Sequence, residues 1–149
     1  MEQHEINLCL AIKAAVTESI ENMVFMVIDT DLNGVSEDIG SDAVFATLRV
    51  LEPRPGLLRL AMPKITAVKI SKNLYSITDG EPSESLICDV TCELLNTISG
   101  RVMKRILPAE CTFHLGLPEM VDKPHDLQGA FVQCSFLADG NLLIVLAQI

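Results

Sequence analysis

Apolar residues recur every third or fourth position in three parts of the chain, which is the period of an amphipathic helix. The pattern covers residues 7–24 and, more strongly, residues 85–107, where Leu94, Ile98, Val102 and Ile106 repeat every four positions. Pro108 predicts the end of this second helix. A weaker helical pattern covers residues 63–78, with Pro63 suited to its start. The sequence therefore predicts two long helices and one shorter helix between them.

The remaining apolar segments have the length and composition of strands. Residues 41–62 form two such segments, and Pro53 and Pro55 interrupt them because proline has no backbone N–H to give to a ladder. This predicts a hairpin. Strands are also predicted in the segment before the Asp-Thr-Asp-Leu-Asn-Gly turn of residues 29–34, and over 112–117, 129–137 and 142–149.

The order of these elements predicts the fold class. Helices and strands do not alternate strictly, so an α+β fold is favoured, in which helices cover one face of an antiparallel sheet. Asp139-Gly140 is a suitable turn for a hairpin between the last two strands. The last strand, 142–149, is apolar to its end and is expected to be an edge that a second copy could pair with.

Length and composition limit the possible functions. The chain has 149 residues, of which 49% are apolar, and this predicts a single folded domain over residues 1–149. A net charge of −9 disfavours nucleic acid as a partner. No apolar run reaches the roughly 18 residues of a membrane span, and the acidic N-terminus is unlike a secretory signal. The five cysteines lie in apolar segments, as reduced thiols do. A cytoplasmic location is expected.

The two long helices show a faint similarity to each other. Residues 18–25 align with residues 93–100 without gaps, which places Glu18 on Glu93 and Met23 on Ile98. This suggests two half-repeats, roughly residues 5–62 and 85–149, linked by the helix at about 63–78. Helical patterning alone could produce much of this match.

The second long helix carries an unusual polar face. At about 100° per residue, Asp89, Glu93, Asn96 and Gly100 fall within roughly one 60° sector, opposite the apolar side. A solvated helix face is the simplest interpretation. However, asparagine is a poor helix former, and a glycine in mid-helix costs about 1 kcal/mol relative to alanine. Glycine does allow another backbone to approach closely, so this face is a candidate contact surface.

Other candidate sites are weaker. Residues 29–34 imitate the start of a calcium loop, but Gly40 stands where the loop needs a bidentate Glu, so a turn with Asx hydrogen bonds is favoured. Cys88 and Cys92 could share a metal, but no paired Cys or His completes four ligands. His114 lies in an apolar strand, where a structural role or a half-exposed position is favoured. The sequence therefore predicts no metal site.

The spacing of the polar face resembles a known signature. Asp89, Glu93 and Asn96, followed by Pro118 in the sequence Leu-Gly-Leu-Pro, are similar to the pattern of the CheC/CheX family of chemotaxis phosphatases. The resemblance implies an antiparallel sheet with two long helices against it, built from two related halves. CheC-type proteins carry two active helices and CheX-type proteins carry one. Here Glu21 replaces the asparagine of the first half, which implies a CheX-like protein with a single site.

The resemblance also implies roles for these residues. Asn96 would position the water that attacks the aspartyl phosphate of a CheY-type receiver domain, and Glu93 would pair with the receiver's active-site lysine. Asp89, Gly100 and Pro118 would contribute to the partner surface. No cofactor of its own is implied, because the receiver carries the Mg²⁺.

Two alternatives remain at this point. The domain could bind a receiver or another signalling protein without hydrolysis. It could also be a structural or dimerisation domain with an incidental polar face, and the resemblance makes a homodimer possible.

Overall fold

The computed structural model describes residues 2–124 and 126–149. Its helical elements are α1 (Gln3–Ser19), a π-helical turn η1 (Ile20–Val24), α2 (Lys64–Leu74) and α3 (Glu84–Ile106). Its strands are β1 (Ile28–Asp29), β2 (Val44–Glu52), β3 (Gly56–Met62), β4 (His114–Leu115), β5 (Glu119–Val121), β6 (Val132–Ala138) and β7 (Asn141–Gln148).

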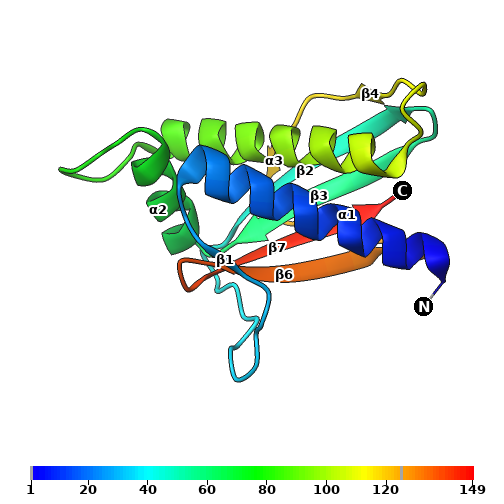
Figure 1. Cartoon of the computed structure of the whole chain (residues 1–149). Coiled ribbons are helices and arrows are strands. Elements are labelled where there is room, and N and C mark those ends of the chain that lie inside the picture. Colours follow the sequence, from blue (N-terminus) through cyan, green and yellow to red (C-terminus); the bar gives the residue numbers. More distant parts are fainter. Residues whose placement is uncertain (1, 125) are drawn as a thin grey trace.

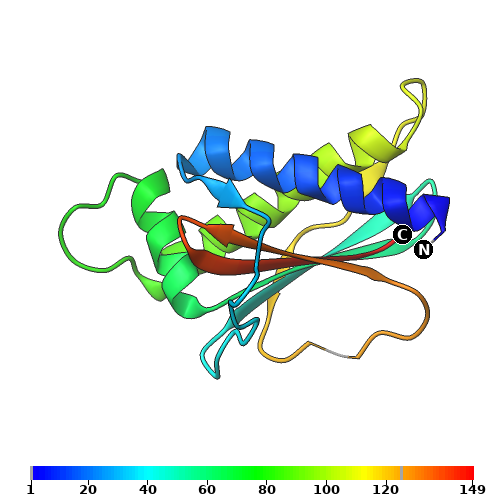
Figure 2. The ribbon, with the colours of Figure 1, turned by 60° about the horizontal axis from the view of Figure 1, so that its bottom comes forward.

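The strands form one antiparallel sheet with the two long helices on one of its faces. The strand order is β1-β6-β7-β3-β2-β4, and β5 also pairs with β2. α1 and α3 lie side by side across the sheet and run in opposite directions, while α2 packs at one end (Figure 1). A second view shows the same two layers, with both long helices on one side of the strands (Figure 2). The predicted α+β class is therefore confirmed.

The period of each element explains this arrangement. Alternate residues of the central strands, such as Leu48 on β2 and Leu60 on β3, are buried toward the helices. The apolar stripe of α3 covers them, and Ile98 at its centre is 0% exposed. Burying an Ile or Leu fully contributes about 1.5–3 kcal/mol, so this layer fixes which side of α3 faces the sheet. The polar side of α3 must then point away from it.

Two strand predictions are wrong in part, and one strand was missed. The strand at 142–149 is not an edge, because β7 pairs with β3 on one side and β6 on the other. Its continuous apolar sequence reflects a central position in the sheet. The strand predicted over 112–117 is reduced to β4, where the register against β2 shifts. β5 was not predicted, because three residues between prolines and polar residues give no period to detect.

The turn predictions agree with the structure. Asp139 and Gly140 have φ angles of 45° and 81° in the β6–β7 turn, the left-handed backbone that this dipeptide favours. Each proposed half begins with a long helix and ends with a hairpin. The internal repetition of residues 5–62 and 85–149 stays a prediction.

Candidate functional site

The ends of α3 are set by local interactions. The Ser83 hydroxyl caps the N-terminus by accepting a hydrogen bond from the Leu86 N–H at 3.1 Å. Glu84 lies in the first turn, and Lys104 and Arg105 lie in the last, where they complement the helix dipole. Lys64 at the start of α2 also forms an ion pair with Glu84. The result is an uninterrupted helix of 23 residues that can present side chains from fixed positions.

Four of the five predicted site residues lie on the outer side of α3. Asp89, Glu93 and Asn96 are exposed, and Gly100 is partly exposed; we refer to these four residues as the α3 stripe. Within the described part of the chain, no hydrogen bond or ion pair engages the side chains of Asp89, Glu93 or Asn96. The carboxylates and the amide therefore face solvent with their bonding capacity unused.

The environment of Gly100 shows that the fold does not require a glycine there. A Cβ atom built on Gly100 would meet no atom within 4 Å, apart from its chain neighbours and the adjacent backbone of α3. Its backbone lies in the middle of a regular helix, where alanine would be more stable. The space above Gly100 is open, so packing within the described chain does not explain why this position is a glycine.

Pro118 is placed apart from these four residues. It lies between β4 and β5 and is partly buried. β5, which starts at the next residue, pairs with β2 and packs against α3. The proline thus belongs to a segment that adjoins α3.

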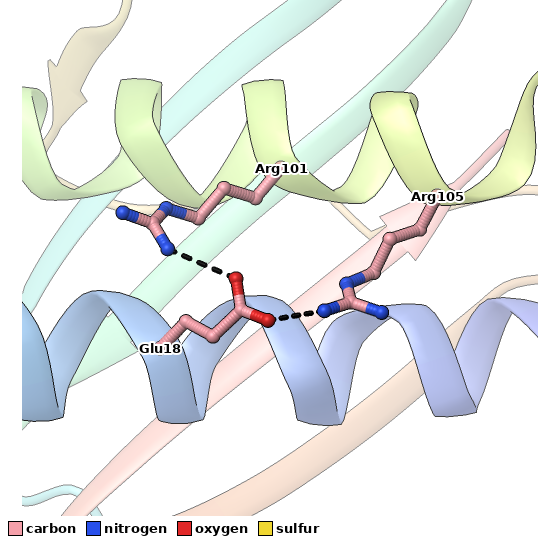
Figure 3. Close-up of polar contacts among 3 residues, drawn as sticks. All are labelled: Glu18, Arg101 and Arg105. Carbon is pink, nitrogen blue, oxygen red and sulfur yellow. Dashed lines mark hydrogen bonds and ion pairs between the residues drawn. The ribbon is translucent and has the colours of Figure 1, made fainter. Parts of the chain in front are cut away.

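Glu18, which aligns with Glu93 in the predicted repeat, has an environment unlike that of Glu93. The Glu18 carboxylate accepts a hydrogen bond from the Arg101 guanidinium at 2.9 Å and another from Arg105 (Figure 3). Arg105, followed by Arg101, lowers the pKa of Glu18 below its usual range. This carboxylate links α1 to α3 and is occupied within the chain. The arginines four residues apart on α3 were the sequence signal for this contact, but a pattern on one helix does not identify its partner on another.

The backbone at Glu21, which aligns with Asn96 in the predicted repeat, differs from that of α3. Glu21 lies within η1, where the α-helix gives way to a π-helical turn over Ile20–Val24. A π-helix has more residues per turn than an α-helix, so the angle between residues 18 and 21 differs from the angle between residues 93 and 96 on α3. Glu21 accepts a 3.4 Å hydrogen bond from the Ile28 N–H. Position 21 therefore differs from position 96 of α3 in both residue type and backbone geometry.

The structure also places the weaker candidates. The Asp29 carboxylate accepts a hydrogen bond from the Asp31 N–H at 2.8 Å, and Asp31 does the same for Asn33 at 3.0 Å. These are the Asx turns predicted in place of a calcium loop. All five cysteines are free, and the described residues contain no group of three or more His, Cys, Asp or Glu side chains placed to hold a metal. His114 is exposed beside Glu52.

Fold and surface together define a class of protein: an α+β domain that presents an exposed acid and amide from a rigid helix. Residues 44–129 match the family model for the chemotaxis phosphatase CheX, and this segment contains the whole α3 stripe and Pro118. Because the match covers more than half of the chain, the protein belongs to the CheX family of chemotaxis phosphatases. A search among curated proteins finds no match.

Several solved structures share the fold. The chemotaxis protein CheX from Vibrio vulnificus superimposes with a TM-score of 0.74 at 13% identity, covering 94% of each chain. CheX from Desulfovibrio desulfuricans gives 0.73 at 13% identity, over 95% of this chain and 97% of that one. The CheX chain of a CheX–CheY–BeF3–Mg²⁺ complex from Borrelia burgdorferi gives 0.72 at 14% identity, over 93% and 94%. At these identities the similarity establishes the fold.

Among the described residues, none of the helices combines the length and the apolar character that a membrane span requires.

Proposed function

We propose that the protein dephosphorylates the aspartyl phosphate of a CheY-type receiver domain, with Asn96 as the catalytic residue and Glu93 as its docking partner. Membership of the CheX family supports the reaction class. A related chain has been solved with CheY bound to BeF3 and Mg²⁺, which supports a receiver as the partner. The roles of Asn96 and Glu93 rest on their position on α3.

The chemistry explains why an amide suits this position. An acyl phosphate is already activated, and the receiver supplies its own Mg²⁺. The remaining requirement is a water molecule held in line with the P–O bond that breaks. Positioning this water therefore supplies most of the rate acceleration. The Asn96 side chain has an acceptor oxygen and an NH₂ donor but carries no charge. It can therefore orient water beside a dianionic phosphoryl group without repelling it.

The acidic residues of the α3 stripe suit an ion pair with a lysine of the receiver. Glu93 lies one turn before Asn96, close enough to ion-pair with a lysine at the edge of the receiver's active site while Asn96 enters it. Asp89 continues the acidic surface, and Gly100 leaves room for partner backbone. Pro118 would contribute from the adjoining segment. The domain needs no cofactor of its own under this mechanism.

One observation carries the proposal: Glu93 and Asn96 are exposed together on the outer side of α3, with no partner among the described residues. Buried or internally paired side chains could not reach a receiver. Glu18 illustrates the contrast, because its carboxylate is taken by two arginines.

The direct test measures inorganic phosphate released from phosphorylated receivers of the same cell, with and without the protein. Wild type should accelerate release, and Asn96→Ala should abolish the acceleration while circular dichroism and Tm stay unchanged. Full activity in Asn96→Ala would refute the catalytic assignment. If wild type binds receivers without accelerating release, the domain is a binding module.

Two further features are part of the proposal. The cytoplasm is the expected location, since five free thiols suit a reducing compartment. A homodimer remains a prediction of the resemblance, without the pairing edge first assigned to residues 142–149. Sedimentation velocity of the whole chain would test it.

A further inference from the structure

We infer that the docking surface extends beyond the α3 stripe to Lys104, and that the charges along α3 fix the direction in which a receiver docks. The acidic end carries Asp89 and Glu93, the basic end carries Lys104, and Gly100 lies between them. This inference rests on the proposed function, because it names a further contact with the same partner. It assigns Lys104 a role in orienting the receiver and no role in the chemical step.

The helix geometry places the two charges on one line. Glu93 and Lys104 are eleven residues apart, so on an α-helix they differ by about 20° in direction and about 16 Å in height. Both residues are exposed. α3 is regular over this whole stretch, which fixes the separation of the two positions. A partner lying along α3 would meet an acidic group, then an open glycine position, then a basic group.

The other two cations near this end are already engaged. Arg101 and Arg105 both turn toward α1, where the Glu18 carboxylate binds them (Figure 3). In the described part of the chain, Lys104 has no such acidic partner. Of the three basic residues in this part of α3, Lys104 is therefore the one whose charge is left for another molecule.

These positions specify a complementary partner surface. It would carry a cation where Glu93 docks and an acidic side chain about 16 Å away, opposite Lys104. In the reversed direction the partner's acidic group would face Asp89 and Glu93, and its cation would face Lys104. Like charges brought together in this way oppose binding, so only one direction is favoured.

A structural role for Lys104 would give different results from a role in docking the receiver. A lysine in the last turn also interacts favourably with the helix dipole. That effect would change stability, but it would not make receiver binding depend on salt. Binding and its salt dependence are therefore the deciding measurements.

The experiment compares Lys104→Glu with Lys13→Glu, which makes the same change in charge on α1. Lys13 is exposed and lies about 140° around α1 from Glu18, the residue that binds α3, so it points away from the α3 stripe. Binding to a CheY-type receiver loaded with BeF3 and Mg²⁺ would be measured by titration at low salt and in 0.5 M NaCl. At the higher concentration the Debye length is only about 4 Å, so exposed charges are strongly screened. Steady-state phosphate release would give kcat and KM.

We expect Lys104→Glu to weaken binding about tenfold at low salt and to raise KM similarly, with kcat within about twofold of wild type. The defect should shrink in high salt, and Lys13→Glu should behave as wild type. Equal binding by Lys104→Glu and wild type, or equal losses in both lysine variants, would overturn the inference while leaving the phosphatase proposal intact. A fall in kcat alone would overturn it too. If wild type neither binds nor dephosphorylates any receiver, both proposals fail together.

Discussion

The carboxylate of Glu18 on α1 binds the guanidinium of Arg101 on α3 at 2.9 Å, and this contact joins the two long helices near their exposed sides. The same carboxylate also binds Arg105. It aligns with Glu93 in the sequence, yet Glu93 has no partner among the described residues. Two glutamates at matching places of a suspected repeat thus have different environments, and this difference favours one active helix.

The Glu18 contact predicts a pH dependence of stability. Its pKa is lowered by Arg105 and Arg101, so the folded state binds the proton less readily than the unfolded state does. The contribution of the ion pairs is therefore present above the unfolded pKa, about 4.3, and is lost as the pH falls through the lowered folded value. The Tm difference between wild type and Glu18→Gln should be largest near neutral pH and vanish in acid. Because both ion pairs are partly exposed, the difference should also shrink in salt.

Thermal unfolding at a series of pH values measures this difference. Glu110→Gln is a suitable control, since Glu110 is exposed and lies outside the ion pairs. A Glu18→Gln difference that persists unchanged at the lowest pH would contradict the assignment.

A single active helix predicts that the Glu21 position is inactive. Glu21→Ala should change phosphate release by less than about twofold, within the range of a surface substitution. Glu21→Asn should also fail to create a site, because η1 disrupts the spacing and Glu18 remains bound to the arginines. The informative measurement adds Glu21→Asn to the Asn96→Ala variant. Recovered phosphate release in that double variant would mean that the first half can act as a site.

Much of this architecture could be predicted from local sequence. The period of residues 85–107 predicted both α3 and the exposure of its polar side, since both follow from which side chains are apolar. The π-helical turn η1 could not be predicted, because Ile20–Val24 has the composition of an ordinary helix. The central place of β7 and the partners of Glu18 were also missed. Both depend on contacts between segments far apart in the chain, which a local period does not encode.

The cysteines are predicted to differ widely in reactivity. Burial, together with the neighbouring Cys9, raises the pKa of Cys134 to about 12. Almost no Cys134 side chain would therefore be the reactive thiolate at pH 8, and the side chain is buried from reagents. Cys111 is exposed. Iodoacetamide should therefore label Cys111 first, and Cys134 only on unfolding. Peptide mapping over time would check this order, and Cys111→Ser should remove the fast phase. Equal labelling of both in the folded protein would contradict it.

Gly100 offers a test in which stability and function should move in opposite directions. A Cβ at this position meets no atom within 4 Å beyond the adjacent helix backbone, so Gly100→Ala introduces no clash within the chain. Replacing a mid-helix glycine should stabilise the fold by about 0.5–1 kcal/mol, which raises Tm by roughly 1–4 °C for a protein of this size. If receiver backbone packs against Gly100, the added methyl group should cost about 1–3 kcal/mol of binding, or roughly five- to more than a hundredfold in KM.

Lys13→Ala provides the matched control for Gly100→Ala. Lys13 is exposed on α1, outside the α3 stripe, and alanine there does not lower helix propensity. Both variants should keep or raise the Tm, and only Gly100→Ala should lose receiver dephosphorylation. Normal dephosphorylation by a stabilised Gly100→Ala variant would show that no partner backbone approaches this position. The receiver would then contact α3 only through longer side chains such as Glu93 and Asn96.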